Sequence, residues 1–135
     1  MKMIKTCKVI YFFLSVLFSI CVTIQFLFAG MAIFMDPGFW ANHVLFIHIF
    51  GFSLPLLMLI FAIFGKMPKW IFYELVIIFV FIFGMYFTAN GGRLLSWIGA
   101  IHPLVGLCLL AISIVNVYHS FQLIKRNNGG MKHGK

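Results

Sequence analysis

The chain has few charged residues: only 9% of its 135 residues are Asp, Glu, Lys or Arg, whereas 64% are hydrophobic. Soluble domains carry about 25% charged residues, so this composition excludes an ordinary water-facing surface. Intrinsic disorder is excluded by the same numbers, because disordered chains need low hydrophobicity and high charge. The sequence therefore predicts an integral membrane protein that crosses the bilayer several times.

Acidic residues are the scarcest group, because the chain has only two, Asp36 and Glu74. The carboxylates that usually drive intramembrane transport and hydrolysis are therefore largely missing, and we predict that the protein is not an enzyme. Glu74 follows Trp70 by about one helical turn. We expect it close to the membrane surface, where its side chain extends towards water and towards Lys66 or Lys69.

The three cysteines carry no metal or redox motif, since no Cys-x-x-Cys pair occurs. Cys7 lies at the edge of the first apolar run, and Cys21 and Cys108 lie near the middle of theirs. We interpret all three as small apolar residues and predict no metal site that depends on them.

Long apolar runs are what the chain has in abundance. A helix rises about 1.5 Å per residue, so about 20 apolar residues cross a hydrocarbon core of about 30 Å. Four runs are long enough, and short turns rich in Gly, Pro and Asn separate them. The predicted spans are residues 9–34, 40–64, 70–88 and 97–124, followed by a polar tail at 125–135. We predict an all-α protein, one membrane domain over residues 1–135, folded as an up-down-up-down four-helix bundle.

The basic residues predict an orientation. Nine of the ten fall before the first span, between the second and third, or after the fourth, and only Arg93 falls on the other side with Asp36. The positive-inside rule then places both termini on the cytoplasmic side. We expect the membrane to be the bacterial cell membrane. The net charge of +8 is explained by this topology and by anionic lipid headgroups at the inner face, so we expect no nucleic-acid partner.

Histidines are the most informative polar residues within the spans. His43 and His48 lie in the second predicted span and His102 in the fourth, all in the outer half of the membrane. Gln25 of the first span lies at a depth similar to that of His48. Because polar side chains in lipid need partners, we expect Gln25, His48 and His102 to face the interior of the bundle.

Glycines and prolines accompany these histidines. Gly51 and Gly106 each lie about one turn from a histidine, which allows a helix or a flat ligand to approach closely. Pro55 and Pro103 are expected to loosen the second and fourth spans.

Three functions remain open for the histidine layer. The first is a set of hydrogen bonds that lock the helices together, each pair contributing about 0.6 kcal/mol. This interpretation, which we expect, describes a structural or accessory protein without a cofactor that works with a membrane-protein partner or as a homo-oligomer. The second is haem b, ligated by one histidine from each of the two spans, with Arg93 meeting a propionate. The third is a metal or small-ligand site open to the outside, transport included.

A second polar pattern lies near the cytoplasmic end of the fourth predicted span. Asn116, His119 and Gln122 recur every three residues and share one helical face. Since a polar stripe this close to the interface is usually exposed, we expect it to face solvent or lipid headgroups.

Two short motifs carry a family resemblance. They are Trp40-x-x-His43 at the start of the second predicted span and His102-Pro103-Leu104 at the start of the fourth. Together with four spans joined by short loops, they resemble an uncharacterised family of small bacterial four-helix integral membrane proteins. The resemblance covers most of the chain in layout and implies no particular activity. It favours His43 and His102 over His48 as the pair at the outer face.

Overall fold

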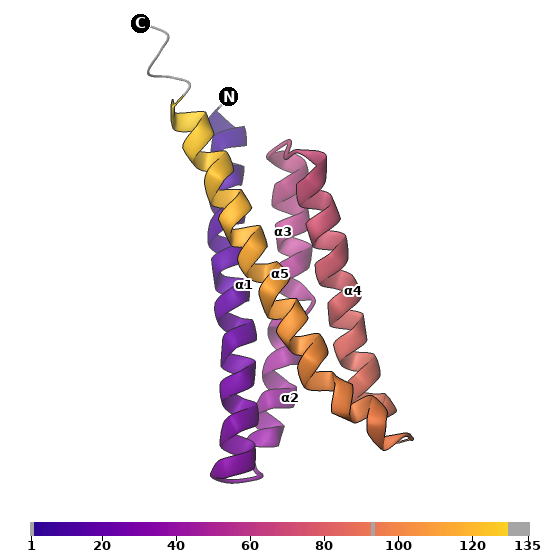
Figure 1. Ribbon diagram of the computed structural model, residues 1–135. Helices are drawn as coiled ribbons and strands as arrows, with labels where there is room; N and C mark the ends of the chain where they lie inside the picture. The colour runs from indigo at the N-terminus through magenta and orange to yellow at the C-terminus, as the bar shows by residue number, and fades with distance from the viewer. Residues whose placement is uncertain (1, 93, 130–135) are drawn as a thin grey trace, which may run out of the picture.

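Five α-helices make up the part of the chain described by the computed structural model, which covers residues 2–92 and 94–129, with side chains as far as residue 126. They are α1 (Lys2–Phe34), α2 (Phe39–Phe50), α3 (Ser53–Phe64), α4 (Lys69–Gly91) and α5 (Ser96–Gly129). Because α2 and α3 continue one another, they form a single rod (Figure 1). The prediction of four helices long and apolar enough to cross a membrane is confirmed.

The second rod is interrupted at Gly51 and Phe52. Pro55 explains the interruption, because it has no amide hydrogen for the carbonyl of Gly51 and its ring crowds that carbonyl. Helical bonding resumes where the Leu56 amide donates to the Phe52 carbonyl at 3.1 Å. Pro103 has no such effect, since α5 runs through it without a break.

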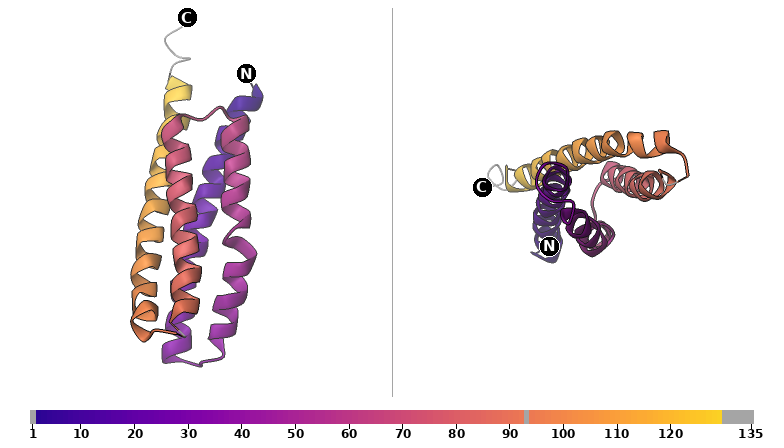
Figure 2. Two further views of the ribbon diagram at one scale, coloured as in Figure 1. Left: turned by 90° about the vertical axis from the view of Figure 1, so that its right-hand side faces the viewer. Right: turned by 90° about the horizontal axis from the view of Figure 1, so that it is seen from below.

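The rods lie side by side (Figure 2). Most of the contacts between helices involve α1 or α5. Helix α1 packs against α2, α3 and α5, and α4 packs chiefly against α5. The largest fully buried apolar side chains come from α1, α3 and α4: Tyr11, Phe18, Met58, Ile71, Ile78 and Ile82. The core therefore runs along the bundle axis, as expected where helices associate by close packing in lipid.

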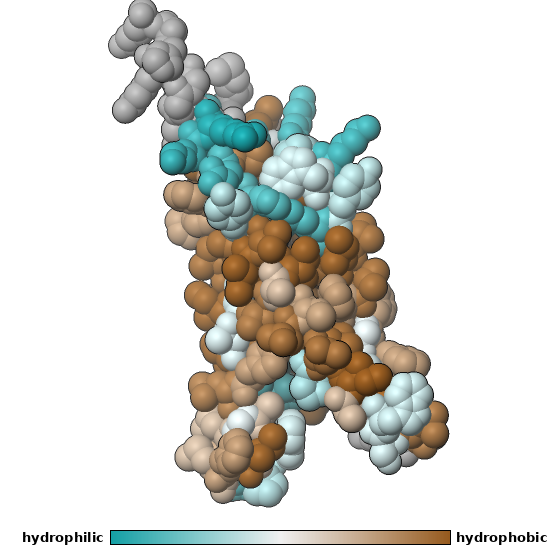
Figure 3. Space-filling model, in the orientation of Figure 1, coloured by the Kyte–Doolittle hydropathy of each residue, from teal (hydrophilic) through white to brown (hydrophobic). Residues whose placement is uncertain are grey.

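One end of the bundle is polar. Figure 3 shows hydrophilic side chains gathered there, above a hydrophobic belt. This end carries the α3–α4 connection, with Lys66 and Lys69, and the last turns of α5, with Lys125 and Arg126. We call it the basic end and the other the opposite end. The first turn of α1 also lies at the basic end (Figure 1).

At the opposite end the helices separate into two pairs, α1 with α2 and α4 with α5 (Figure 2). Glycines keep the second pair close, because a Cβ atom on Gly92 would lie only 2.9 Å from the Gly99 Cα atom. In the first pair, the Gly38 amide donates to Asp36 Oδ1 at 2.7 Å and closes the α1–α2 turn. The surface is hollowed between the two pairs (Figure 3).

Candidate functional site

A cavity of about 310 Å³ opens between the two helix pairs. Its walls are mostly apolar side chains of α1, α2, α4 and α5, and its polar members include Gln25, His43 and His102. A second cavity, of about 390 Å³, shares these three residues and extends to His48. We call the two cavities together the histidine cleft. Their volumes fall in the range of about 300–1,000 Å³ that is usual for small-ligand sites.

Two hydrogen bonds between Gln25 and His43 join α1 to α2. Gln25 Nε2 donates to the His43 backbone carbonyl at 3.0 Å, and His43 Nδ1 lies 3.1 Å from the Gln25 backbone carbonyl. Since a carbonyl can only accept, the hydrogen is on His43 Nδ1. The lone pair of the neutral ring is then on Nε2.

Thr88 fixes His102 in the same way and joins α4 to α5. Thr88 Oγ1 donates its single hydrogen to the Gly84 carbonyl at 2.8 Å. With that hydrogen donated to the carbonyl, Oγ1 accepts from His102 Nδ1, which lies 2.9 Å away. The neutral ring of His102 also keeps its lone pair on Nε2, and the ring centroids of His43 and His102 are 6.5 Å apart.

Gln25 supplies a third acceptor. Its side chain is 7% exposed, and Oε1 is a buried atom without a hydrogen-bond partner in the described part of the chain. Flipping the amide does not help, because Nε2 already donates to a carbonyl that cannot donate in return. An unpaired buried acceptor costs about 1–3 kcal/mol, so it indicates a donor that comes from outside the protein chain.

The structure brings Gln25, His43 and His102 together in both cavities, whereas His48 lines the second cavity only. His48 is exposed, and its ring stacks on Tyr86 with the centroids 5.6 Å apart. Its Nδ1 lies 3.1 Å from the Tyr86 hydroxyl. Arg93, predicted to meet a haem propionate, lies outside the described residues.

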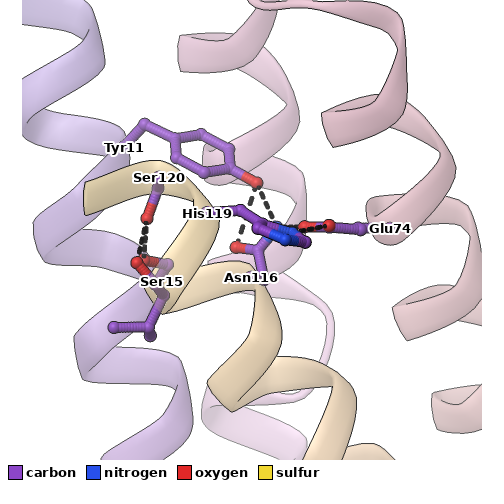
Figure 4. Close-up of polar contacts among 7 residues, drawn as sticks. Tyr11, Ser15, Glu74, Asn116, His119 and Ser120 are labelled. Carbon is purple, nitrogen blue, oxygen red and sulfur yellow. Dashed lines mark hydrogen bonds and ion pairs between the residues drawn. The ribbon is translucent and has the colours of Figure 1, made fainter. Parts of the chain in front are cut away.

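A second polar cluster, near the basic end, was not predicted from the sequence (Figure 4). At its centre, Asn116 Nδ2 donates to the Tyr11 hydroxyl at 2.9 Å and to Glu74 Oε2 at 2.8 Å. The Tyr11 hydroxyl lies 3.1 Å from Asn116 Oδ1, and His119 Nδ1 donates to Glu74 Oε1 at 2.5 Å. We call Tyr11, Glu74, Asn116 and His119 the polar network. It joins α1, α4 and α5.

Serine pairs continue this polar contact between α1 and α5. The hydroxyls of Ser15 and Ser120 are 3.2 Å apart (Figure 4), and Ser19 donates to Ser113 at 3.0 Å. Small hydroxyl residues let two helices approach closely and hydrogen-bond across the interface.

The expectation for Glu74 is wrong, and that for the polar stripe is wrong at Asn116, although the His119 side chain is 41% exposed. Glu74 is 8% exposed and, among the described residues, pairs with α5 and not with Lys66 or Lys69. Asn116 is 0% exposed and does not face solvent or headgroups. The physical reason is that a carboxylate in an apolar surrounding needs a donor on each oxygen, and the α4–α5 contact supplies both.

The sequence does contain a signal for the polar network, namely the depth at which two of its residues lie in the membrane. Glu74 lies five residues after Lys69, and His119 lies six residues before Lys125. If both lysines mark the same membrane surface, the acid and the imidazole lie at nearly equal depth. Matching the polar residues of different spans by depth therefore predicts this contact.

One family model matches the chain. It is described as a family of unknown function (DUF6220), and the match covers residues 25–93, just over half of the chain. No curated protein and no solved structure matches. The matched segment contains Gln25, His43 and Glu74, whereas His102 lies beyond it. The finding agrees with an uncharacterised family, while the two short motifs and the bacterial origin stay predictions.

Proposed function

The chain belongs to the DUF6220 family, whose function is unknown, and we propose from its geometry that it binds a small lipid-soluble ligand in the histidine cleft. We place the protein in the bacterial cell membrane, with an up-down-up-down topology and both termini in the cytoplasm. In this proposal the protein holds its ligand without transforming it.

The distribution of charge supports this orientation. The first turn of α1, the α3–α4 connection and the last described turns of α5 lie at the basic end, which the positive-inside rule assigns to the cytoplasm. The histidine cleft then opens in the outer leaflet. An alkaline phosphatase fused after Lys135 should be inactive, and one inserted between Pro37 and Gly38 should be active. The reverse pattern overturns the orientation.

The observation that carries the proposal is that the cleft holds three acceptors to which no described residue donates. His43 Nε2, His102 Nε2 and Gln25 Oε1 are three acceptors in a mostly apolar surrounding. The ligand that complements them has an apolar body and hydroxyl donors, and a flat aromatic diol has both. Each hydrogen bond contributes about 1 kcal/mol, and desolvation in the cleft makes an unmet acceptor costly.

The surrounding residues position these acceptors before a ligand arrives. The hydrogen bonds to Gln25 and Thr88 fix the rings of His43 and His102, so little side-chain freedom is lost on binding. Gly106 lets Phe26 and Met85 pack closely on α5 in the wall of the cleft, because a Cβ atom there would lie 3.3 Å from both Phe26 Cζ and Met85 Cε.

Haem is the second candidate, and the spacing of the histidines favours it. His43 and His102 come from different helices and their ring centroids lie 6.5 Å apart, so both imidazoles would be in a position to hold haem. The Nδ1 hydrogen bonds are the support that ligating histidines usually have. Haem would need no further protein ligand, and within the described residues no three metal-binding side chains converge. Such a group supplies one-electron chemistry.

The test is to identify what the protein carries. The chain is purified in mild detergent from haem-replete cells, its visible spectrum is recorded, and its organic extract is analysed by mass spectrometry. We expect a hydroxyl-bearing lipophilic compound in near-stoichiometric amount with the wild type and with Thr23→Val, an exposed position of α1 that lines neither cavity. We expect a loss of at least tenfold with His102→Leu. A Soret band abolished by His102→Leu identifies haem instead. If the wild type and His102→Leu carry the same material, the cleft is not a ligand site and the hydrogen bonds serve only to join helices.

A further inference from the structure

A second opening lies at the basic end, between α4 and α5, and has a volume of about 550 Å³. Three polar side chains come from one face of α5, where His119, Gln122 and Arg126 are spaced by three and four residues. Trp70 of α4 and Tyr118 line it as well. We call this opening the basic-end pocket. It differs from the histidine cleft in having a cationic donor, the Arg126 guanidinium, in its lining.

Glu74 lies at the inner side of this pocket and sets the direction of His119. Both carboxylate oxygens are already engaged, one by Asn116 and the other by His119 Nδ1. The side chain of Glu74 is 11% exposed, whereas that of His119 is 41% exposed. Trp70 packs edge-on against the imidazole with the ring centroids 4.9 Å apart. The imidazole is therefore held by its Nδ1 edge, and its Nε2 is on the other edge of the ring.

Arg126 has no acidic partner in the described part of the chain. Asp36 lies at the opposite end, and the oxygens of Glu74 are held by α5. Lys66 and Lys69 add positive charge at the same end of the bundle. An unpaired guanidinium at the rim of a pocket, with an amide and an imidazole one and two turns away, is an arrangement suited to an oxyanion.

We propose that the basic-end pocket binds a phosphate group. The Arg126 guanidinium and the Gln122 amide donate to its oxygens. His119 donates from Nδ1 to Glu74, so its Nε2 accepts from a hydroxyl of the same ligand, such as a headgroup hydroxyl or the P–OH of a free phosphate. The site is separate from the histidine cleft and does not depend on the ligand proposed there.

Two sources can supply this phosphate: the headgroup of an anionic lipid or a free phosphate in the aqueous phase. The pocket lies where an aromatic side chain, Trp70, and basic residues mark the membrane surface, the level of lipid headgroups. Basic pockets between membrane helices on the cytoplasmic side bind such headgroups. The chemistry of recognition is the same for both sources, so the experiment has to separate them.

The experiment measures phosphatidylglycerol retained by the full chain in native mass spectrometry, with inorganic phosphate as a competing probe. Arg126→Gln is compared with Lys125→Gln, which removes the same charge from the neighbouring position. We expect at least a tenfold loss of retained lipid with Arg126→Gln and less than a twofold loss with Lys125→Gln. Both residues are exposed near the end of a helix, so the variants should fold, and size-exclusion chromatography checks this.

The competing probe identifies the source. If millimolar inorganic phosphate leaves the lipid bound, the ligand is the headgroup. If it displaces the lipid from the wild type and itself binds in an Arg126-dependent way, the pocket is a phosphate site. Equal losses with the two variants indicate only diffuse attraction of anions to a basic surface and overturn the proposal. The absence of binding by either probe overturns it as well.

Discussion

The two polar clusters within the apolar bundle differ in how far they satisfy their own hydrogen bonds. In the polar network both carboxylate oxygens and the central amide of Asn116 have partners within the protein. The histidine cleft contains similar groups, an amide and imidazoles, yet it leaves Gln25 Oε1 without a partner. A cluster that satisfies itself joins helices, whereas a cluster that lacks donors is suited to a ligand that brings them.

The largest effect expected from this difference is on stability. Asn116→Leu leaves the Tyr11 hydroxyl and Glu74 Oε2 without their donor, and it should lower the free energy of unfolding by about 3 kcal/mol. His102→Leu should lower it by only about 0.6–1 kcal/mol, the usual contribution of a hydrogen bond between membrane helices. Reversible unfolding in mixed micelles measures both variants. Equal losses contradict the contrast between the two clusters.

The next effect concerns the glycine contact that holds α4 to α5 beside the cleft. In Gly92→Ala the new Cβ atom lies 2.9 Å from the Gly99 Cα atom, so the helices must move apart at a cost of about 1–2 kcal/mol. Gly30→Ala is the matched control in the wall of the cleft, because its Cβ atom meets nothing within 4 Å. That variant should be neutral or slightly stabilising, through the better helix propensity of alanine. The same unfolding measurement compares the two variants. A loss of stability in Gly30→Ala as large as that in Gly92→Ala contradicts the importance of the glycine contact.

The smallest effect on stability, and the most selective, is expected for Gln25→Leu. The variant loses one hydrogen bond to the His43 carbonyl but also removes the unpaired acceptor, so stability should change by less than about 0.5 kcal/mol. Affinity for a hydroxyl-bearing ligand should nevertheless fall about tenfold, which corresponds to about 1.4 kcal/mol. Unfolding and ligand titration on the same sample separate the two quantities. A strongly destabilised variant shows that Gln25 serves packing and not a ligand.

The sequence predicts the spans well and the contacts between them poorly. Hydropathy identifies all four rods, since about 20 apolar residues in a row are decisive for a membrane helix. Pro55 indicates where the second rod is weak, because a proline removes one helical hydrogen bond. The burial of Glu74 by Asn116 could not be read from either span alone, because it depends on how α4 and α5 align.

The histidine cleft was predicted in part. A shared depth identifies Gln25 and the histidines as candidates for one layer, and the structure places His43 and His102 there with Gln25. Helical rotation decides which histidines lie at both cavities of the cleft, and the sequence of one span does not reveal it. His48 lines only the second cavity, beside Tyr86. The contacts of Thr88 with His102 and of Tyr86 with His48 depend on the same rotation of the helices about their axes.

The histidine cleft is proposed to offer acceptors to a ligand that brings donors, and one titration tests this claim most directly. The measurement is a titration of the full chain in lipid nanodiscs with a lipophilic aromatic diol and with its dimethyl ether, followed by quenching of tryptophan fluorescence, since Trp40 lines the cleft. We expect the diol to bind at least tenfold more tightly than the ether, and this preference to disappear in Gln25→Leu and His102→Leu but not in Thr23→Val, which lies outside both cavities. Equal affinity for the diol and the ether in the wild type would contradict the account.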